Sequence, residues 1–174
     1  MKKIYIVLTF TNTVISKLIK IKTNHEFCHS SISLDKNLDY MYSFGRLNPY
    51  TPLFAGFVQE YQHKGTFKRF KYTKVQIQEL EVTDRQYLDI SQAIREIELN
   101  KKHYKFNIIG LVAAGANIKY KRKKALYCSE FVRMILEKAN VDLTGIPAVA
   151  APEMFKNLKN SKIIYNGLLT EYKS

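Results

Sequence analysis

The sequence predicts an α+β fold, because strand signals fill the first half of the chain and helix signals follow them. Apolar runs and alternating apolar and polar residues, both typical of strands, occur at residues 4–10, 27–34, 40–44, 54–61 and 67–82. Two stretches with one apolar helical face come later, at residues 83–97 and 129–139. This order favours an antiparallel sheet with helices packed against it. At 174 residues, the whole chain is predicted to form one domain, residues 1–174.

Each strand is predicted from its own pattern. Residues 4–10 are continuously β-prone, whereas residues 27–34 alternate between two faces. The sequence DKNLD at residues 35–39 is turn-like, so residues 40–44 are the predicted return strand of a hairpin. Residues 45–52 contain two prolines and are predicted to be a loop. The strand signal of residues 54–82 is interrupted near residues 63–65.

The helices are marked by their ends as well as by their apolar faces. Thr83 and Gln86 form the pattern of a capping box at the start of the first helix. The second helix runs over residues 129–139, and Asn140 is placed to end it. Weaker signals predict a short basic helix over residues 13–21, a helix or buried loop over 108–116, and a basic turn over 119–124. From Pro152 onward, a short helix and a strand around residues 163–165 are expected.

Composition indicates a globular, strongly basic protein. Apolar residues make up 46% of the chain, which excludes an intrinsically disordered protein. Lys and Arg number 28 against 15 Asp and Glu, giving a net charge of +13. Such a surface attracts nucleic acid, acidic lipid head groups or acidic cell-wall polymers, although it is equally typical of a lysine-rich surface that only keeps a protein soluble.

Cysteine usage and hydropathy indicate the cellular setting. Cys28 and Cys128 are too few for a disulfide framework and lack the spacing of zinc ligands, so we expect a reducing, cytoplasmic location and no metal or other cofactor. The apolar run at residues 4–10 is too short for a signal peptide and no cleavage site follows it. No run approaches the roughly 18 apolar residues of a transmembrane helix.

Cys128 and His29 are the residues best placed for nucleophilic chemistry. Cys128 immediately precedes the second helix, where the positive end of the helix dipole and free N–H groups favour thiolate. The basic run at residues 121–124 acts in the same direction. His29 lies on a strand, which can hold an imidazole rigidly as a base. Taken singly, each is more typical of a structural residue. Cys28 is predicted to point to the opposite sheet face and into the core.

Two segments of the chain together resemble a known superfamily. The sequence HSSISLD at residues 29–35, followed much later by YCSEFV at residues 127–132, resembles circularly permuted papain-like cysteine hydrolases. These form the branch of the NlpC-type superfamily that includes YiiX-like proteins and the lecithin:retinol acyltransferase group. The sequences MYSFGR and AGFVQE, at residues 41–46 and 55–60, are similar to small bacterial members. The resemblance implies a papain-like antiparallel sheet with the cysteine-bearing helix packed against it.

The resemblance also implies a mechanism and a third site residue. Cys128 would attack an amide or ester carbonyl, and His29 would transfer the proton. A polar group on the neighbouring strand usually orients such a histidine. A hairpin that turns near Asn37 brings Ser43 close to His29, in a position where relatives have His, Glu, Gln or Asn. Ser43 is therefore the first candidate for this role, and Glu60, on a later strand, is the alternate.

The expected substrate is peptide-like or anionic. In a papain-like cleft, residues 45–56 and 117–127 would line the site, and Arg46 and Tyr127 are the candidate substrate-binding residues. The predicted function is a cysteine amidase or peptidase that acts on peptides such as cell-wall fragments. A lipid or thioester acyltransferase is one alternative. A basic module that binds nucleic acid or an anionic surface through residues 63–74 and 119–124, with a degenerate site, is another, and nucleic acid is the less favoured partner.

Overall fold

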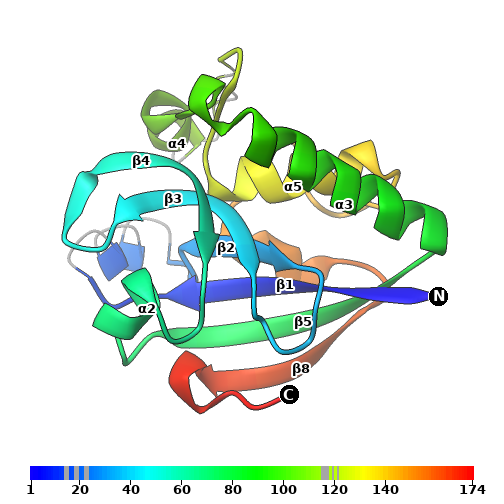
Figure 1. Cartoon of the computed structure of the whole chain (residues 1–174), viewed down its shortest axis with the longest axis horizontal. Coiled ribbons are helices and arrows are strands. Elements are labelled where there is room, and N and C mark those ends of the chain that lie inside the picture. The colour runs from blue at the N-terminus through cyan, green and yellow to red at the C-terminus, as the bar shows by residue number, and fades with distance from the viewer. Residues whose placement is uncertain (14–15, 18–19, 22–23, 115–117, 119, 121) are drawn as a thin grey trace.

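One six-stranded antiparallel sheet forms the centre of the protein, as the alternating segments predict (Figure 1). The computed structural model describes residues 1–174 except 14–15, 18–19, 22–23, 115–117, 119 and 121, and omits the side chains of residues 52, 53, 112 and 114. The strands lie in the order β4-β3-β2-β1-β5-β8. Their bounds are β1 Lys2–Phe10, β2 His29–Ser33, β3 Met41–Asn48, β4 Thr51–Glu60, β5 Lys74–Val82 and β8 Ser161–Leu168.

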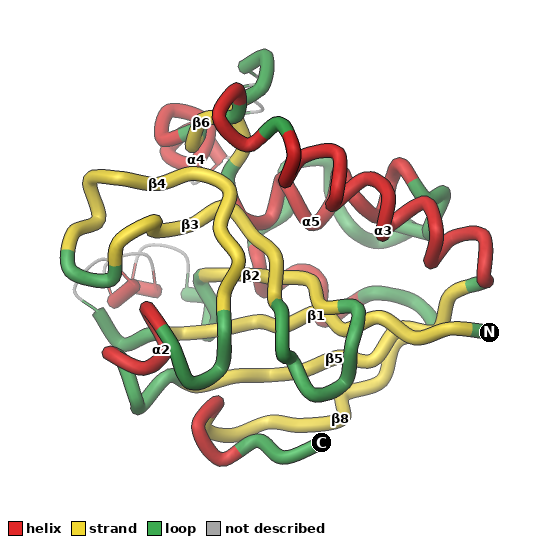
Figure 2. The backbone as a smooth tube through the Cα atoms, in the orientation of Figure 1, coloured by secondary structure: helices red, strands yellow, loops and turns green. Residues whose placement is uncertain are grey.

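Two long helices, α3 (Asp84–Leu99) and α5 (Cys128–Lys138), lie together over one face of this sheet (Figures 1 and 2). The predicted capping box starts α3: the Gln86 N–H donates to Thr83 Oγ1 at 3.1 Å, and the Thr83 N–H donates to Gln86 Oε1 at 3.0 Å. The helix α5 ends before Asn140, which adopts a φ of 52°, the left-handed conformation that closes many helices. These features confirm both predicted helices.

The alternation of β1 divides the apolar residues into two cores. Ile4, Ile6 and Leu8 are fully buried toward α3 and α5, and they belong to the larger core. Tyr5 and Val7 belong to a smaller core on the other face, together with residues of β5 and the C-terminal segment. The central strand is thus buried on both faces, which explains why residues 4–10 are almost continuously apolar.

Aromatic rings connect α5 to the strands that carry the candidate site. Phe131 is fully buried, and its ring lies 5.5 Å from Phe44 in β3 and 5.9 Å from Phe57 in β4. The two strand rings are themselves 5.9 Å apart in an edge-on arrangement. Such pairs favour fixed geometries, so this cluster fixes the start of α5 relative to β3 and β4.

The structure differs from the expected elements in two places and decides between two alternatives in a third. The predicted loop at residues 45–52 is mostly strand, because β3 continues to Asn48 and β4 begins at Thr51. The expected strand from residue 67 begins only at Lys74, since Gly65–Arg69 forms the short helix α2 around the buried Phe67. Residues 108–116, left open between helix and loop, include the helix α4, Ile108–Ala114.

The smaller elements complete the chain. The bounds are η1 Lys101–His103, β6 Lys105–Phe106, β7 Ala125–Leu126, η2 Pro152–Asn157 and η3 Leu169–Glu171. The short parallel pair of β6 and β7 leads into α5. Parts of the predicted helix at 13–21 and of the basic turn at 119–124 lie outside the described residues. Among the described residues, no helix is both long and apolar enough to cross a membrane.

Candidate active site

Cys128 is the first residue of α5, directly after the N-cap residue Tyr127. Its side chain is buried, and the backbone of Ser30 and of Ser129 contributes to lowering the pKa of the thiol. The 11-residue helix directs the positive end of its dipole toward the same atom. The local sequence therefore places the thiol where negative charge is favoured, although burial alone would oppose it.

His29 is the first residue of β2 and pairs with Thr9 of β1. Its Nε2 atom lies 3.0 Å from Glu60 Oε1 and 3.1 Å from Oε2, at the end of β4. Because Glu60 occupies Nε2, the Nδ1 atom is the ring nitrogen left for Cys128. Strand β2 thus presents one imidazole between a carboxylate and a thiol.

A serine completes the contacts of the Glu60 carboxylate. The Ser31 hydroxyl donates to Glu60 Oε2 at 2.6 Å and lies 3.4 Å from His29 Nε2. Ser31 is fully buried and Glu60 is 8% exposed, so this network lies almost out of water. Ser31 was not among the predicted site residues, although the alternation of β2 places it two residues from His29 on the same face.

Ser43, the first candidate for orienting His29, does not contact it. The Ser43 hydroxyl is buried and donates to the backbone carbonyl of Ser30 at 2.7 Å. Strand pairing explains the difference, because the register Ile32 to Tyr42 sets Gly45, not Ser43, opposite His29. A Cβ added to Gly45 would lie 3.3 Å from His29 Cε1 and 3.6 Å from Glu60 Oε1. Because Gly45 has no side chain, space remains between β2 and β4 for the Glu60 carboxylate to contact the His29 ring.

Cys128 and His29 change each other's pKa. Burial raises the pKa of the Cys128 thiol, but the hydrogen-bonding and charge interactions with His29 outweigh this effect and lower it overall. Burial likewise lowers the pKa of His29, but the Glu60 carboxylate and the Cys128 sulfur raise it well above its ordinary value. Both directions favour a thiolate beside an imidazolium. We describe this as a property of the pair, since the two groups titrate together.

Cys28 lies closer to Cys128 than the alternation pattern predicted. It precedes β2, so the two-residue period does not fix its direction, and its half-buried side chain lines the same cavity as Cys128. Burial, together with the neighbouring Cys128, raises the pKa of Cys28 to about 12. The Cys28 thiol lies 3.9 Å from the Thr9 carbonyl. Of the two cysteines, only Cys128 has surroundings that favour the thiolate.

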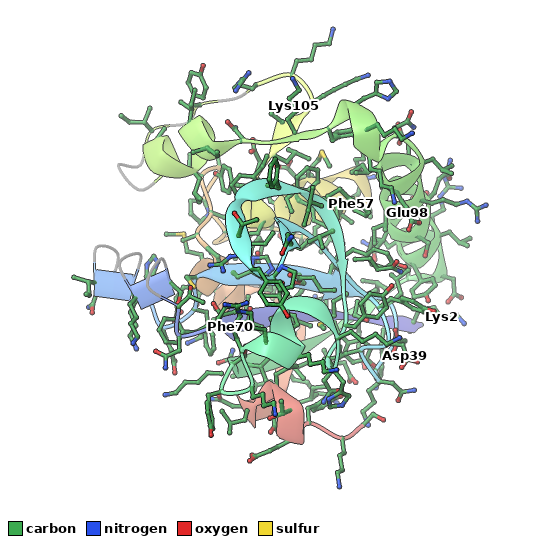
Figure 3. The ribbon with its side chains drawn as sticks, turned by 60° about the vertical axis from the view of Figure 1, so that its left-hand side comes forward. Lys2, Asp39, Phe57, Phe70, Glu98 and Lys105 are labelled. Atoms are coloured by element: carbon green, nitrogen blue, oxygen red, sulfur yellow. The ribbon has the colours of Figure 1, made fainter. Side chains whose placement is uncertain are left out.

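A cavity of about 300 Å³ contains both members of the pair. Its walls include residues of β2, β3, β4, β6, α2, α4 and α5, and most of its surface is apolar. The residues that line it include Cys128, His29, Glu60, Arg46, Phe67 and Ile108. Figure 3 views the molecule from the side on which β3, β4 and α2 lie.

The structure separates the two candidate substrate-binding residues. Arg46 lines the cavity of Cys128, whereas Tyr127 lines a second cavity of about 280 Å³. Arg122 and Lys124, from the basic run, also line this second cavity, whereas the main contributions that lower the pKa of Cys128 come from His29 and from the backbone of Ser30 and Ser129. Lys121 lies outside the described residues. The basic run was expected to favour the Cys128 thiolate, but its described residues are not among the main causes of the lowered pKa.

The described residues contain no group of three or more His, Cys, Asp or Glu side chains arranged to hold a metal ion. A thiol, an imidazole and a carboxylate lie next to one another at this site, in that spatial order. This is the arrangement that activates a nucleophile. Comparison of the chain with protein-family models and with curated proteins finds no match.

Proposed function

We propose that this protein is a cysteine amidase or peptidase of the circularly permuted papain-like kind, with Cys128 as nucleophile, His29 as proton carrier and Glu60 as the residue that orients His29. One observation supports this most strongly: His29 interacts with the Cys128 sulfur while its Nε2 atom lies 3.0 Å from Glu60. The α+β sheet with the cysteine-bearing helix on one face is compatible with such a fold.

The proposed reaction uses an acyl-enzyme. The Cys128 thiolate attacks the carbonyl carbon of an amide, and the charge that develops on oxygen is stabilised by backbone N–H groups at the start of α5. The His29 imidazolium gives its proton to the departing amine, which breaks the C–N bond. His29 then takes a proton from water as the water attacks the thioester. The C–S bond breaks, the acid is released, and the Cys128 thiolate is restored beside the His29 imidazolium.

The proposed substrate is peptide-like, such as a fragment derived from the cell wall. We place the protein in the cytoplasm, as its two unpaired cysteines suggest, where fragments taken up by the cell would be available. A lipid or thioester acyltransferase would use the same acyl-enzyme. Binding of anionic surfaces remains a second candidate function, because α2 and the residues after it expose Lys68, Arg69, Lys71 and Tyr72 beside a net charge of +13.

The proposal is tested with fluorogenic peptide amides and matched esters, together with an electrophilic peptide probe that alkylates active-site thiols. We expect release of the fluorophore, acylation of Cys128 observed by mass spectrometry of the intact protein, and loss of both with Cys128→Ala and His29→Ala. Cys28→Ala is the control and should retain most activity. Labelling that occurs at Cys28, or turnover that survives Cys128→Ala, would contradict the assignment.

A further inference from the structure

Two arginines and two aromatic rings form a row that leads out of the Cys128 cavity. The Arg46 guanidinium lies over the Phe70 ring, 5.7 Å from its centroid. Arg69 lies 5.6 Å from the centroid of the same ring and 4.3 Å from that of Tyr50. Arg46 lines the cavity, whereas Arg69 and Tyr50 are exposed. Phe70, which the two arginines share, is labelled in Figure 3. We call these four residues the arginine row.

Neither guanidinium of the arginine row has a carboxylate partner among the described residues, which include every Asp and Glu of the chain. Within the described part of the chain, the hydrogen bond that Arg46 donates goes to a neutral hydroxyl, Thr13 Oγ1, at 3.2 Å. By contrast, Arg85 and Arg133 each pair with a carboxylate on their own helix. A half-buried arginine that keeps its charge without a counter-ion is costly, unless the site receives an anion from a ligand.

We infer that the arginine row is a substrate-recognition site for acidic peptides, in which Arg46 binds one carboxylate inside the cavity and Arg69 binds a second carboxylate at its mouth. This inference rests on the proposed function, and it names the substrate class. The two guanidinium carbons are no further apart than the sum of their distances to the Phe70 centroid. In an extended peptide, side chains two residues apart are separated by about 7 Å and point to the same side, which lies within this upper limit.

The shape and charge of the site favour a peptide over a nucleic acid. The row begins in the cavity that holds the thiol, so a ligand bound to Arg46 places its backbone near Cys128. Planar guanidinium groups stacked on rings are already oriented, so they can accept carboxylates in the two-bonded geometry with little loss of entropy. The cavity walls, which include Phe67 and Ile108, suit the aliphatic part of an acidic side chain.

The test measures binding to the full chain carrying Cys128→Ala, with four acetylated, amidated peptides that contain Glu-Gly-Glu, Glu-Gly-Gln, Gln-Gly-Glu or Gln-Gly-Gln. We expect the diacid to bind roughly tenfold more tightly than either monoacid, because a hydrogen-bonded charge pair typically contributes this much or more. Its affinity should fall as salt rises. Arg69→Gln should remove the advantage of the second carboxylate and leave one monoacid unaffected. Arg46→Gln should weaken the other monoacid and the diacid.

Arg95→Gln is the matched control, since it removes the same charge from an exposed site on α3 and should leave all four affinities unchanged. Arg46→Lys keeps the charge, so retention of only part of the affinity would indicate a requirement for guanidinium geometry. Equal binding of the diacid and the diamide would overturn the inference. So would tighter binding of a single-stranded oligonucleotide that the same arginine variants abolish. Peptide binding to the Cys128→Ala protein, with no acylation of Cys128 when the wild-type protein is given the same peptides, would instead reject the proposed hydrolase and keep the recognition site.

Discussion

Ser31 donates a hydrogen bond of 2.6 Å to the Glu60 carboxylate, and the same carboxylate contacts His29. The serine hydroxyl also lies 3.4 Å from His29 Nε2, so it fixes both the carboxylate and the imidazole and acts as a positioning residue. Three strands supply the network, because His29 and Ser31 lie in β2, Glu60 lies in β4, and Gly45 of β3 leaves the space between them.

Replacing Ser31 with alanine should slow alkylation of Cys128 by iodoacetamide several-fold near pH 6. Without the hydroxyl, the buried carboxylate loses one donor and His29 loses part of its fixed orientation. The rate is measured by mass spectrometry. Ser33→Ala is the control, because Ser33 is also a buried β2 serine but donates to the Tyr40 carbonyl at 2.7 Å. Equal rates for the two variants would show that Ser31 has no positioning role.

Glu60→Gln should shift the alkaline limb of the pH–activity profile to lower pH. The Glu60 charge helps to raise the pKa of His29 despite its burial, so removing that charge lets the imidazolium lose its proton earlier. Since the imidazolium must give a proton to the leaving amine, activity then declines at a lower pH than in the wild-type protein. An unchanged alkaline limb would mean that Glu60 does not support the charge on His29.

Cys128 should be alkylated far faster than Cys28 across the neutral range. The pKa of Cys128 is lowered through His29, whereas that of Cys28 is raised to about 12 by burial and by the nearby Cys128. At pH 7, a thiol of pKa 12 is thiolate in only about one molecule in 10⁵. The Cys128 rate should fall only when the pH drops through its lowered pKa. Peptide mapping after brief labelling separates the two cysteines, and comparable labelling would contradict the ion pair.

The α+β class and the order of the main elements could be predicted from the sequence, because they depend on local periodicity. The pair of Cys128 and His29 was predicted only with the help of the resemblance of residues 29–35 and 127–132 to a known superfamily, because each residue alone is more typical of a structural role. The sequence did not distinguish Ser43 from Glu60. Hairpin pairing places Ser43 on the strand beside β2, but Glu60 reaches His29 across β3 from the next strand, and this contact depends on how the sheet curves. The short helix α2 was missed because residues 65–69 have no strong helix signal beyond the basic side chains at its end.

Gly45→Ala should reduce the reactivity of Cys128 while the fold is kept. The added methyl group would lie 3.3 Å from His29 Cε1 and 3.6 Å from Glu60 Oε1, so the ring must move away from its contacts. Crowding of this kind typically costs about 1–3 kcal/mol. The matched control is Gly56→Ala, in the strand pair directly opposite Gly45, where the new methyl group would lie 3.6 Å from the flexible end of Leu47. The measurements are the rate of Cys128 alkylation by iodoacetamide at pH 6 and the thermal unfolding of both variants. Slower alkylation of Gly45→Ala at similar thermal stability would indicate a displaced His29 rather than general destabilisation. Wild-type reactivity in a folded Gly45→Ala protein would show that the space opposite His29 is not needed to align it with Glu60 and Cys128.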